Sequence, residues 1–404
     1  MSNDGDAIGP LAGLRVVDLT VELGAYTSRL FADLGADVVR VKRPRPPAAP
    51  TTGIDPFARF NNAGKRSLTL DLDRDSGRAV LGRLLARSDI LILGMDPAWA
   101  RDHGLDPDAL ASEFPSLIVV AVTPLGWDHT DAAVPDDDLT VLAAGGLLNL
   151  GGYPDAEPVA AYGRQSHVAA SLFGAVAALI SLLDRARTGR ARWVDISAQE
   201  CVAQALEDSV ATYDLTGHVR VRLGSEPREA GTGIYACADG YVAMVAGRLG
   251  TMKAWHTLVA WLVELGIPGA DVLTGPAWST LTHRQLPASI ETFGEVFDRF
   301  TASRTRQHLY EEAQRRQIAL SPVNDIDAVV ADPQLAARGF FVSVEDSALG
   351  RTMRYPGPPY RLSATPATPA RPAPSRGADS DAILAETVGL DAAEIGSLRT
   401  VGVV

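Results

Sequence analysis

The residues best suited to acid–base or nucleophilic chemistry lie on either side of a predicted helix. Three aspartates, Asp136 to Asp138, precede a helical segment, and His167 ends a polar loop just before an apolar run, residues 168–183. Imidazole titrates near neutrality and can accept or donate a proton, while a carboxylate can act as a base or as a nucleophile. Aspartates at a helix start also act as caps that complement the helix dipole. The spacing therefore indicates either acid–base chemistry or a purely structural pair of helix starts.

The apolar run itself predicts a buried helix, because it is apolar on all sides. Small residues recur along it, which would let other backbone segments approach closely. Residues 188–190, T-G-R, break the helix, and Trp193 to Ile196 reads as a short strand. The run is at the short limit for spanning a bilayer and charges flank it closely. We therefore expect a central core helix with His167 on its first turn, and no membrane association.

Composition places the chain among soluble globular proteins that are large enough for two domains. The 404 residues are 46% hydrophobic and carry a net charge of -12, which argues against nucleic acid and against an anionic membrane surface as partners. Cys201 and Cys237 lack metal-ligand spacing, so neither a disulfide nor a metal site is expected. The N-terminus has no basic start and no apolar stretch, which makes cytoplasmic localisation the expectation.

The first forty residues predict a parallel sheet. Residues 14–19 read as a buried strand, 27–34 as a helix and 38–41 as a second strand, which is a βαβ unit of ordinary length. No G-x-G-x-x-G follows the first strand, so the fingerprint of dinucleotide binding is absent.

Two basic clusters follow this unit in an otherwise acidic chain. Arg40, Lys42, Arg43 and Arg45 form the first, and the N-x-x-x-K-R-S segment from Asn61 to Ser67 contains the second. Arg and Lys are the side chains that neutralise phosphates, so the clusters indicate an anion site. A solvated basic loop is the alternative.

Several segments together resemble the family III CoA-transferases, the group that includes formyl-CoA and carnitine CoA-transferases and the α-methylacyl-CoA racemases. The matching segments are G-L-R-V-V-D-L-T to V-K at 13–42, N-x-x-x-K-R-S at 61–67, Y-x-C-A-D-G-Y-V-A at 235–243, D-P-Q-L-x-x-R-G at 332–339 and P-G-P-P-Y-R-L at 356–362.

The resemblance implies an α/β fold with a Rossmann-like large domain, an inserted smaller α+β domain and an interlocked homodimer. On this pattern we expect a large domain over 1–217, a linker over 218–230, a small domain over 231–320 and a return to the large domain over 321–404. A Pro-rich stretch that ends at Pro374 reads as an extended linker.

The resemblance also implies coenzyme A, carried as an acyl-CoA substrate, and no metal. A related small carboxylic acid would be the other ligand. The residues that we assign to the CoA site on this basis are Leu23, Gly24, Ala25, Arg40, Lys42, Arg43, Asn62, Lys65, Arg66 and Gly126.

Two departures from the family pattern bear on chemistry. The catalytic Asp that the family carries before the central helix is replaced by His167, and the racemase His aligns with Asp137. The family's E-N-F-x-P-G segment, often with an Arg, is replaced by L-G-M-D-P-A at 93–98, so that Asp96 stands where an anion would be held. An acid there would repel phosphate.

Three functions stay open at this stage. The leading hypothesis is proton transfer, such as racemisation or isomerisation of an acyl-CoA, by His167 and Asp137. The second is CoA transfer between carboxylic acids with a relocated carboxylate, Asp137 or Asp138. A relocated carboxylate is needed because His167 cannot form the enzyme-bound aspartyl-CoA thioester of this reaction. The third is a degenerate, non-catalytic homologue or partner subunit.

Overall fold

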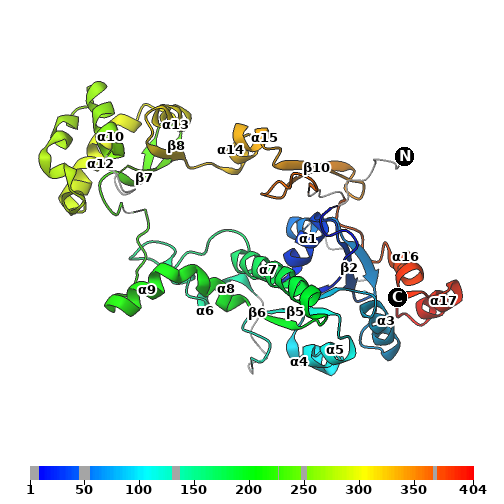
Figure 1. The fold of residues 1–404 in the computed structure, drawn as a ribbon. Coiled ribbons are helices and arrows are strands. Elements are labelled where there is room, and N and C mark those ends of the chain that lie inside the picture. Colours follow the sequence, from blue (N-terminus) through cyan, green and yellow to red (C-terminus); the bar gives the residue numbers. More distant parts are fainter. Residues whose placement is uncertain (1–8, 45–54, 130–136, 226, 247–252, 367–370) are drawn as a thin grey trace. The chain divides into compact units, whose positions relative to one another are not determined.

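The computed structural model describes residues 9–44, 55–129, 137–225, 227–246, 253–366 and 371–404 (Figure 1). Arg45 and Asp136, which belong to segments singled out above, lie outside these residues. The chain divides into two compact units. The larger comprises Met1–Gly151, Pro158–Val221 and Gln334–Val404, and the smaller comprises Gly152–Glu157 and Arg222–Pro333.

The larger unit is built on a parallel sheet, which confirms the predicted α/β fold class. In the described part of the chain this sheet has six strands in the order β3-β2-β1-β4-β5-β6, the order of a doubly wound dinucleotide-binding fold. The strands are β1 (Arg15–Thr20), β2 (Asp37–Lys42), β3 (Arg66–Thr69), β4 (Ile90–Gly94), β5 (Ile118–Thr123) and β6 (Trp193–Ser197).

Alternate residues of each strand enter different cores, because successive side chains of a strand point to opposite faces. Val16 and Ile90 pack with the helices of one face, whereas Val17 and Leu91 pack with those of the other. The first face is covered by α1 (Ala25–Asp33), α6 (Asp138–Ala144), α7 (Gln165–Thr188) and α8 (Ala198–Ala203). The second is covered by α3 (Asp75–Leu85), α4 (Pro97–Asp102), α5 (Pro107–Glu113), the π-helical turn η5 (Ile383–Val388) and α17 (Ala392–Thr400).

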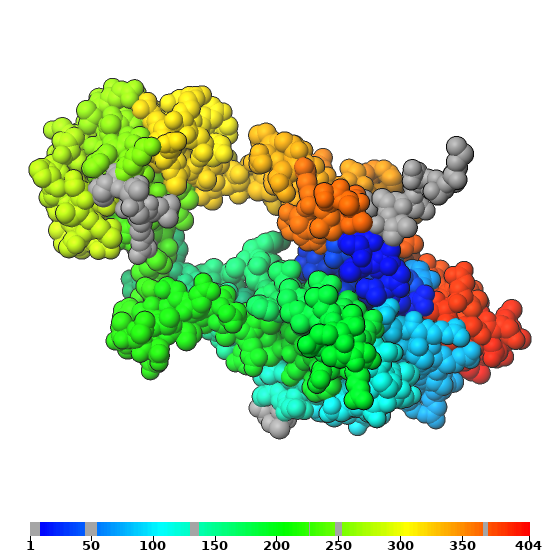
Figure 2. Space-filling view, viewed as in Figure 1, coloured from blue at the N-terminus to red at the C-terminus, as the bar shows by residue number. Residues whose placement is uncertain are grey.

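The remaining elements of the larger unit lie outside these two layers. They are α2 (Pro56–Asn62), η1 (Leu148–Leu150), η2 (Gln204–Leu206), α9 (Glu207–Thr216), α15 (Pro333–Ala337), the hairpin β10 (Phe341–Asp346) and β11 (Arg351–Pro356), and α16 (Ser380–Ala382). Tyr355 of the hairpin packs on Phe60 of α2 with ring centroids 5.9 Å apart. In Figure 2 this hairpin, in orange, lies against the blue N-terminal part of the same unit.

Helix α7 is only partly the core helix that the sequence predicts. Ala170, Gly174 and Ala178 are buried, and a side chain at Gly174 would come within 3.0 Å of Thr27 of α1. The opposite face is apolar and open to solvent, with Val176 54% exposed and Leu183 73% exposed. By length and composition alone the helix could cross a membrane, but its small residues pack on α1 and the sheet.

The smaller unit has its own core around an antiparallel sheet. Among the described residues the strands are β7 (Thr232–Cys237), β8 (Gly240–Val245) and β9 (Ala319–Pro322), in that order. Cys237 pairs with Gly240, which confirms the predicted hairpin, but the two turn residues are Ala238 and Asp239 rather than Asp239 and Gly240, because Gly240 already begins β8. The helices are α10 (Lys253–Glu264), η3 (Ala270–Thr274), η4 (Pro276–Ser279), α11 (Leu281–Arg284), α12 (Pro287–Thr301), α13 (Arg306–Arg315) and α14 (Ile326–Val330).

Candidate active site

A cavity of about 610 Å³ opens at the carboxyl ends of β1, β2 and β4. Thr20 ends β1 and Met95 follows β4, and these neighbouring strands are where the strand order reverses. Ligands of open α/β sheets bind at this switch point. We call this cavity the main chamber. Its wall combines apolar and aromatic side chains, Val21, Phe57, Met95 and Trp99, with charged ones.

A smaller cavity of about 320 Å³, the side chamber, shares part of that wall. Arg40, Lys42 and Arg376 line both chambers. The side chamber is closed by residues 373–376 of the C-terminal segment and by Ser67 of β3. The two chambers therefore meet at a cluster of cations, as an anionic ligand requires.

The arginines around this cluster contact backbone carbonyls and an aromatic ring, and burial affects the lysine. Arg40 is buried and donates to the carbonyl of Val21 at 3.1 Å. Burial, together with the charges of Arg40 and Arg376, lowers the pKa of Lys42 to about 8. The guanidinium of Arg43 lies over the Trp99 ring, 4.6 Å from its centroid. Of the predicted CoA residues, Ala25 and Asn62 also line the main chamber.

Two of the predicted CoA-binding cations are engaged in structural contacts instead. Lys65 is fully buried and its Nζ donates to Asp18 at 2.8 Å, to the carbonyl of Ala25 at 2.9 Å and to Asn62 at 3.1 Å. Its three donors are thus used within the fold. Arg66 binds the carboxylate of Asp37 through two nitrogens, at 2.8 and 2.6 Å. Neither residue is among those that line the chambers.

Three further residues of the predicted CoA site shape the backbone rather than the chamber wall. Leu23 is buried, and Gly24 has a φ of 82° with the side chain of Val122 beside its Cα. Gly126 has a φ of 103° in the turn after β5 and donates to Thr123 Oγ1 at 3.0 Å. Such φ values favour glycine.

His167 lies on the first turn of α7 and only 3% of it is exposed. One turn later, the Ser171 carbonyl accepts a hydrogen bond from Thr27 Oγ1 at 3.0 Å, so the first turn of α1 lies beside the second turn of α7. Arg164, immediately before α7, forms an ion pair with Glu22. Its guanidinium carbon lies over the Phe57 ring, 4.1 Å from the ring centroid. Since Glu22 and Phe57 both line the main chamber, Arg164 ties the start of α7 to that chamber.

The two candidate carboxylates act as helix caps. Asp137 is exposed and accepts from Leu139 N at 2.9 Å at the start of α6. Asp138 accepts from both Ser166 N, at 2.8 Å, and Ser166 Oγ, at 2.7 Å, and so caps α7 from outside. Asp138 is thus the carboxylate seen to contact the turn that contains His167, and the expected pairing of Asp137 with His167 stays a prediction.

Several side chains that line the chambers or contact their lining were not identified by the sequence analysis. Arg376 follows a Pro-rich stretch that reads as a linker, while Arg164, Phe57 and Trp99 belong to none of the matched motifs. Asp96, expected to repel phosphate, accepts from Trp99 N at 2.8 Å as the cap of α4. Within the described residues no group of three or more His, Cys, Asp or Glu side chains is placed to hold a metal ion.

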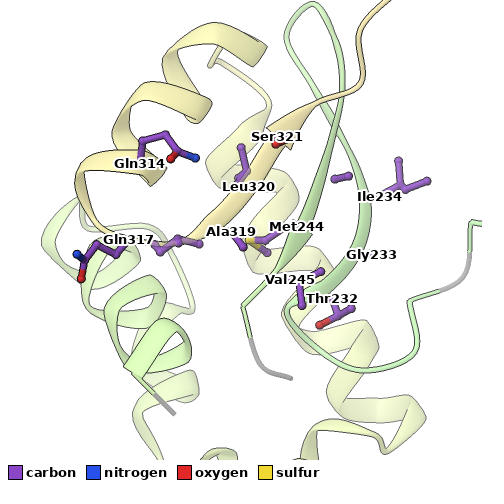
Figure 3. Close-up of a pocket in the computed structure, with 12 residues that line it drawn as sticks. Thr232, Gly233, Ile234, Met244, Val245, Gln314, Gln317, Ala319, Leu320 and Ser321 are labelled. Atoms are coloured by element: carbon purple, nitrogen blue, oxygen red, sulfur yellow. The ribbon is translucent and has the colours of Figure 1, made fainter. Parts of the chain in front are cut away.

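The smaller unit contains a separate open hollow of about 800 Å³ (Figure 3). It lies between α13 and the β7-β8-β9 sheet, with Gln314 and Gln317 on one side and Ile234 and Met244 on the other. None of the described residues that line it carries a charge, so it lacks the means to neutralise phosphates.

This fold and this cation-lined switch point define a protein of the CoA-transferase type. The family model for CoA-transferase family III matches residues 11–380, and the chain belongs to that family.

Named relatives and a solved structure agree with this assignment. The chain is 35% identical, over 96% of its length and 97% of the relative's, to the "Succinyl-CoA:(R)-benzylsuccinate CoA-transferase subunit BbsE" of Thauera aromatica. It is 28% identical, over 97% of both chains, to the "Succinyl-CoA--L-malate CoA-transferase beta subunit" of Chloroflexus aurantiacus. The crystal structure of a CAIB/BAIF family protein from Brucella suis superposes with a TM-score of 0.81 at 26% identity, and covers 94% of this chain and 100% of that one.

Proposed function

We propose that this chain is the CoA-binding subunit of a CoA-transferase that uses an acyl donor of the succinyl-CoA type, and that a partner chain supplies the nucleophilic carboxylate. The observation that carries the proposal is the first turn of α7. His167, which stands at the position of the family's catalytic Asp in the motif match, is buried there, and the two described aspartates that we considered as replacements, Asp137 and Asp138, are engaged as helix caps.

CoA transfer requires a carboxylate that attacks the thioester carbonyl. The attack forms an enzyme–acyl anhydride and releases CoA thiolate, which then attacks the enzyme's carbonyl, frees the acid and leaves an enzyme–CoA thioester. A carboxylate whose oxygen already accepts two hydrogen bonds from Ser166 is a weakened nucleophile, because those bonds stabilise its charge.

Two observations support a partner chain. The relatives with 35% and 28% identity are both named as subunits. The outward face of α7 exposes Leu172, Val176, Ile180 and Leu183, a continuous apolar surface of the kind that association buries. A second copy of this chain would repeat His167, whereas a non-identical family member with an Asp at that position would supply the nucleophile.

The test is to trap the enzyme-bound intermediate. The purified chain is incubated with succinyl-CoA and then with hydroxylamine, and peptides are examined by mass spectrometry for a hydroxamate. We expect no adduct on the chain alone, an adduct at position 167 in His167→Asp, and none in the matched control His167→Asn. An adduct on the unmodified chain, at Asp138 or elsewhere, would refute the partner-supplied carboxylate.

A second candidate is proton transfer at the carbon next to the thioester, favoured by the burial of His167 on the first turn of α7, a helix start that Arg164 ties to the main chamber. In this case Asp138, rather than Asp137, would orient the turn that holds the imidazole. Uptake of deuterium from heavy water into an acyl-CoA substrate, abolished by His167→Ala, would support it. Turnover without any such uptake would exclude it.

A further inference from the structure

The C-terminal segment completes the phosphate-binding side of the cavity. Residues 371–380 run along the outer edge of β3, the end strand of the sheet. Ser67 N donates to Asp379 at 2.8 Å and Thr69 N donates to Ser380 Oγ at 3.1 Å, so side chains of this segment satisfy the exposed edge of β3. Covering an edge in this way fixes the segment to the sheet. The predicted linker is therefore packed structure from residue 371 onward.

A tight turn places Arg376 over the cavity. Gly377 has a φ of 69°, and its N donates to Ser67 Oγ at 3.0 Å. A Cβ at this glycine would lie 2.8 Å from Thr69 Oγ1, so no other residue fits without displacement. Arg376 itself donates through Nη1 to the carbonyl of Arg43 at 2.6 Å, which anchors one end of its guanidinium beside β2.

The charge around the side chamber favours an anion. Arg40, Lys42 and Arg376 line it and form no salt bridge with any described carboxylate, while Arg59 is paired with Asp346. Asp55 is the carboxylate among the lining residues, and it accepts from Phe57 N and Ala58 N as the cap of α2. On the β4 side of the main chamber, Asp96 offers no donor and caps α4. The cations are thus concentrated toward the C-terminal segment.

The shape of the two chambers matches the branching of CoA. The main chamber offers Trp99, Phe57 and Met95 to a flat apolar group such as adenine. The 5′-pyrophosphate continues from the ribose toward the pantetheine, whereas the 3′-phosphate is a branch that ends at the ribose. The side chamber is small and shares its cations with the main chamber, so it suits the 3′-phosphate, which is the end of its branch.

We infer that Arg376 is a specificity-determining residue that binds the 3′-phosphate of CoA in the side chamber, in place of donors from the loop after β4. A terminal phosphate offers several free oxygens to the planar fork of an arginine. This inference rests on the proposed CoA-binding function and deepens it, since it names the ligand group that the C-terminal segment selects.

Calorimetric titration with CoA and with 3′-dephospho-CoA tests the inference on the full chain. The unmodified chain should bind CoA at least tenfold more tightly than dephospho-CoA, as expected for a charged hydrogen-bond pair. Arg376→Gln should weaken CoA roughly tenfold, leave dephospho-CoA almost unchanged and so abolish the preference. Arg376→Lys should retain part of it. Arg371→Gln, an equal change of charge at an exposed position outside both chambers, is the matched control and should retain all of it.

The outcomes separate this inference from the proposed function. If CoA binds but Arg376→Gln keeps the preference, or weakens both ligands equally, the role of Arg376 is refuted and the CoA site stands. If the unmodified chain binds neither ligand at millimolar concentration, the CoA-binding function fails and the inference fails with it.

Discussion

Replacing Lys65 by Met should destabilise the larger unit severely, because it leaves the buried carboxylate of Asp18 without its ion-pair partner. Asp18 is fully buried and its carboxylate accepts from Lys65 Nζ at 2.8 Å, from Ser28 Oγ at 2.7 Å and from Thr20. Although burial alone would raise the pKa of Asp18, the charges of Lys65 and Arg40 lower it to about 2. Removing one partner of such a buried pair costs about 3–5 kcal/mol.

Urea unfolding followed by circular dichroism measures this loss. The matched control is Arg66→Met, the next residue in the chain, whose ion pair with Asp37 is partly exposed and should contribute about 0–1 kcal/mol. Adding Asp18→Asn to Lys65→Met should recover part of the stability, because the double variant buries no unpaired charge. A loss below about 1 kcal/mol for Lys65→Met, or no larger than that of Arg66→Met, would contradict the structural role assigned to Lys65.

The pH dependence gives an independent check of the same pair. In the unmodified chain the folded pKa of Asp18 lies below its ordinary value of 3.8, so the associated stability is present above that pH and is lost as the pH falls toward 2. Without Lys65, the raising effect of burial is less opposed and the pKa of Asp18 is higher, so its carboxyl group takes up a proton more readily as the pH falls. The difference in unfolding free energy between the two proteins should therefore shrink as the pH falls from 7 to 4. A constant difference would refute the assignment.

Three further predictions concern the chambers and the start of α7. CoA affinity should fall severalfold between pH 7 and 9, because Lys42 must be protonated to bind a phosphate and its pKa is about 8. Calorimetry measures this affinity. In Lys42→Arg, whose guanidinium keeps its charge, the affinity should not change over this pH range. Asp138→Ala should cost about 0.5–2 kcal/mol in urea unfolding through loss of the cap on Ser166, and Asp138→Asn should retain part of it. Gly24→Val should destabilise the chain by more than 1 kcal/mol in the same assay, because a β-branched residue is strained at a φ of 82°; a neutral result would contradict the observed turn.

The backbone architecture was largely predictable from local pattern. Strand β5, I-V-V-A-V-T, is an apolar run up to its last residue, and such runs buried on both faces belong to parallel sheets. The Asp239-Gly240 pair predicted the β7-β8 hairpin, in which Ala238 and Asp239 form the turn and Gly240 begins β8 with a φ of 147°. These features depend on residues close together in the chain, which is why the fold class and the family could be derived without coordinates.

The roles of individual side chains depended on contacts that no local pattern encodes. Lys42 and Lys65 occupy similar basic segments, yet Lys42 faces the chambers while Lys65 is enclosed with Asp18, because the sheet brings β1 beside the end of α2. The apolar run of α7 is uniform in sequence, and only its packing on α1 decides which face is open. Arg376 reaches the site because its segment pairs with the edge of β3, whose residues lie more than three hundred positions earlier. Sequence alone determined the frame and the family, whereas burial and long-range packing decided which charges are free to bind a ligand.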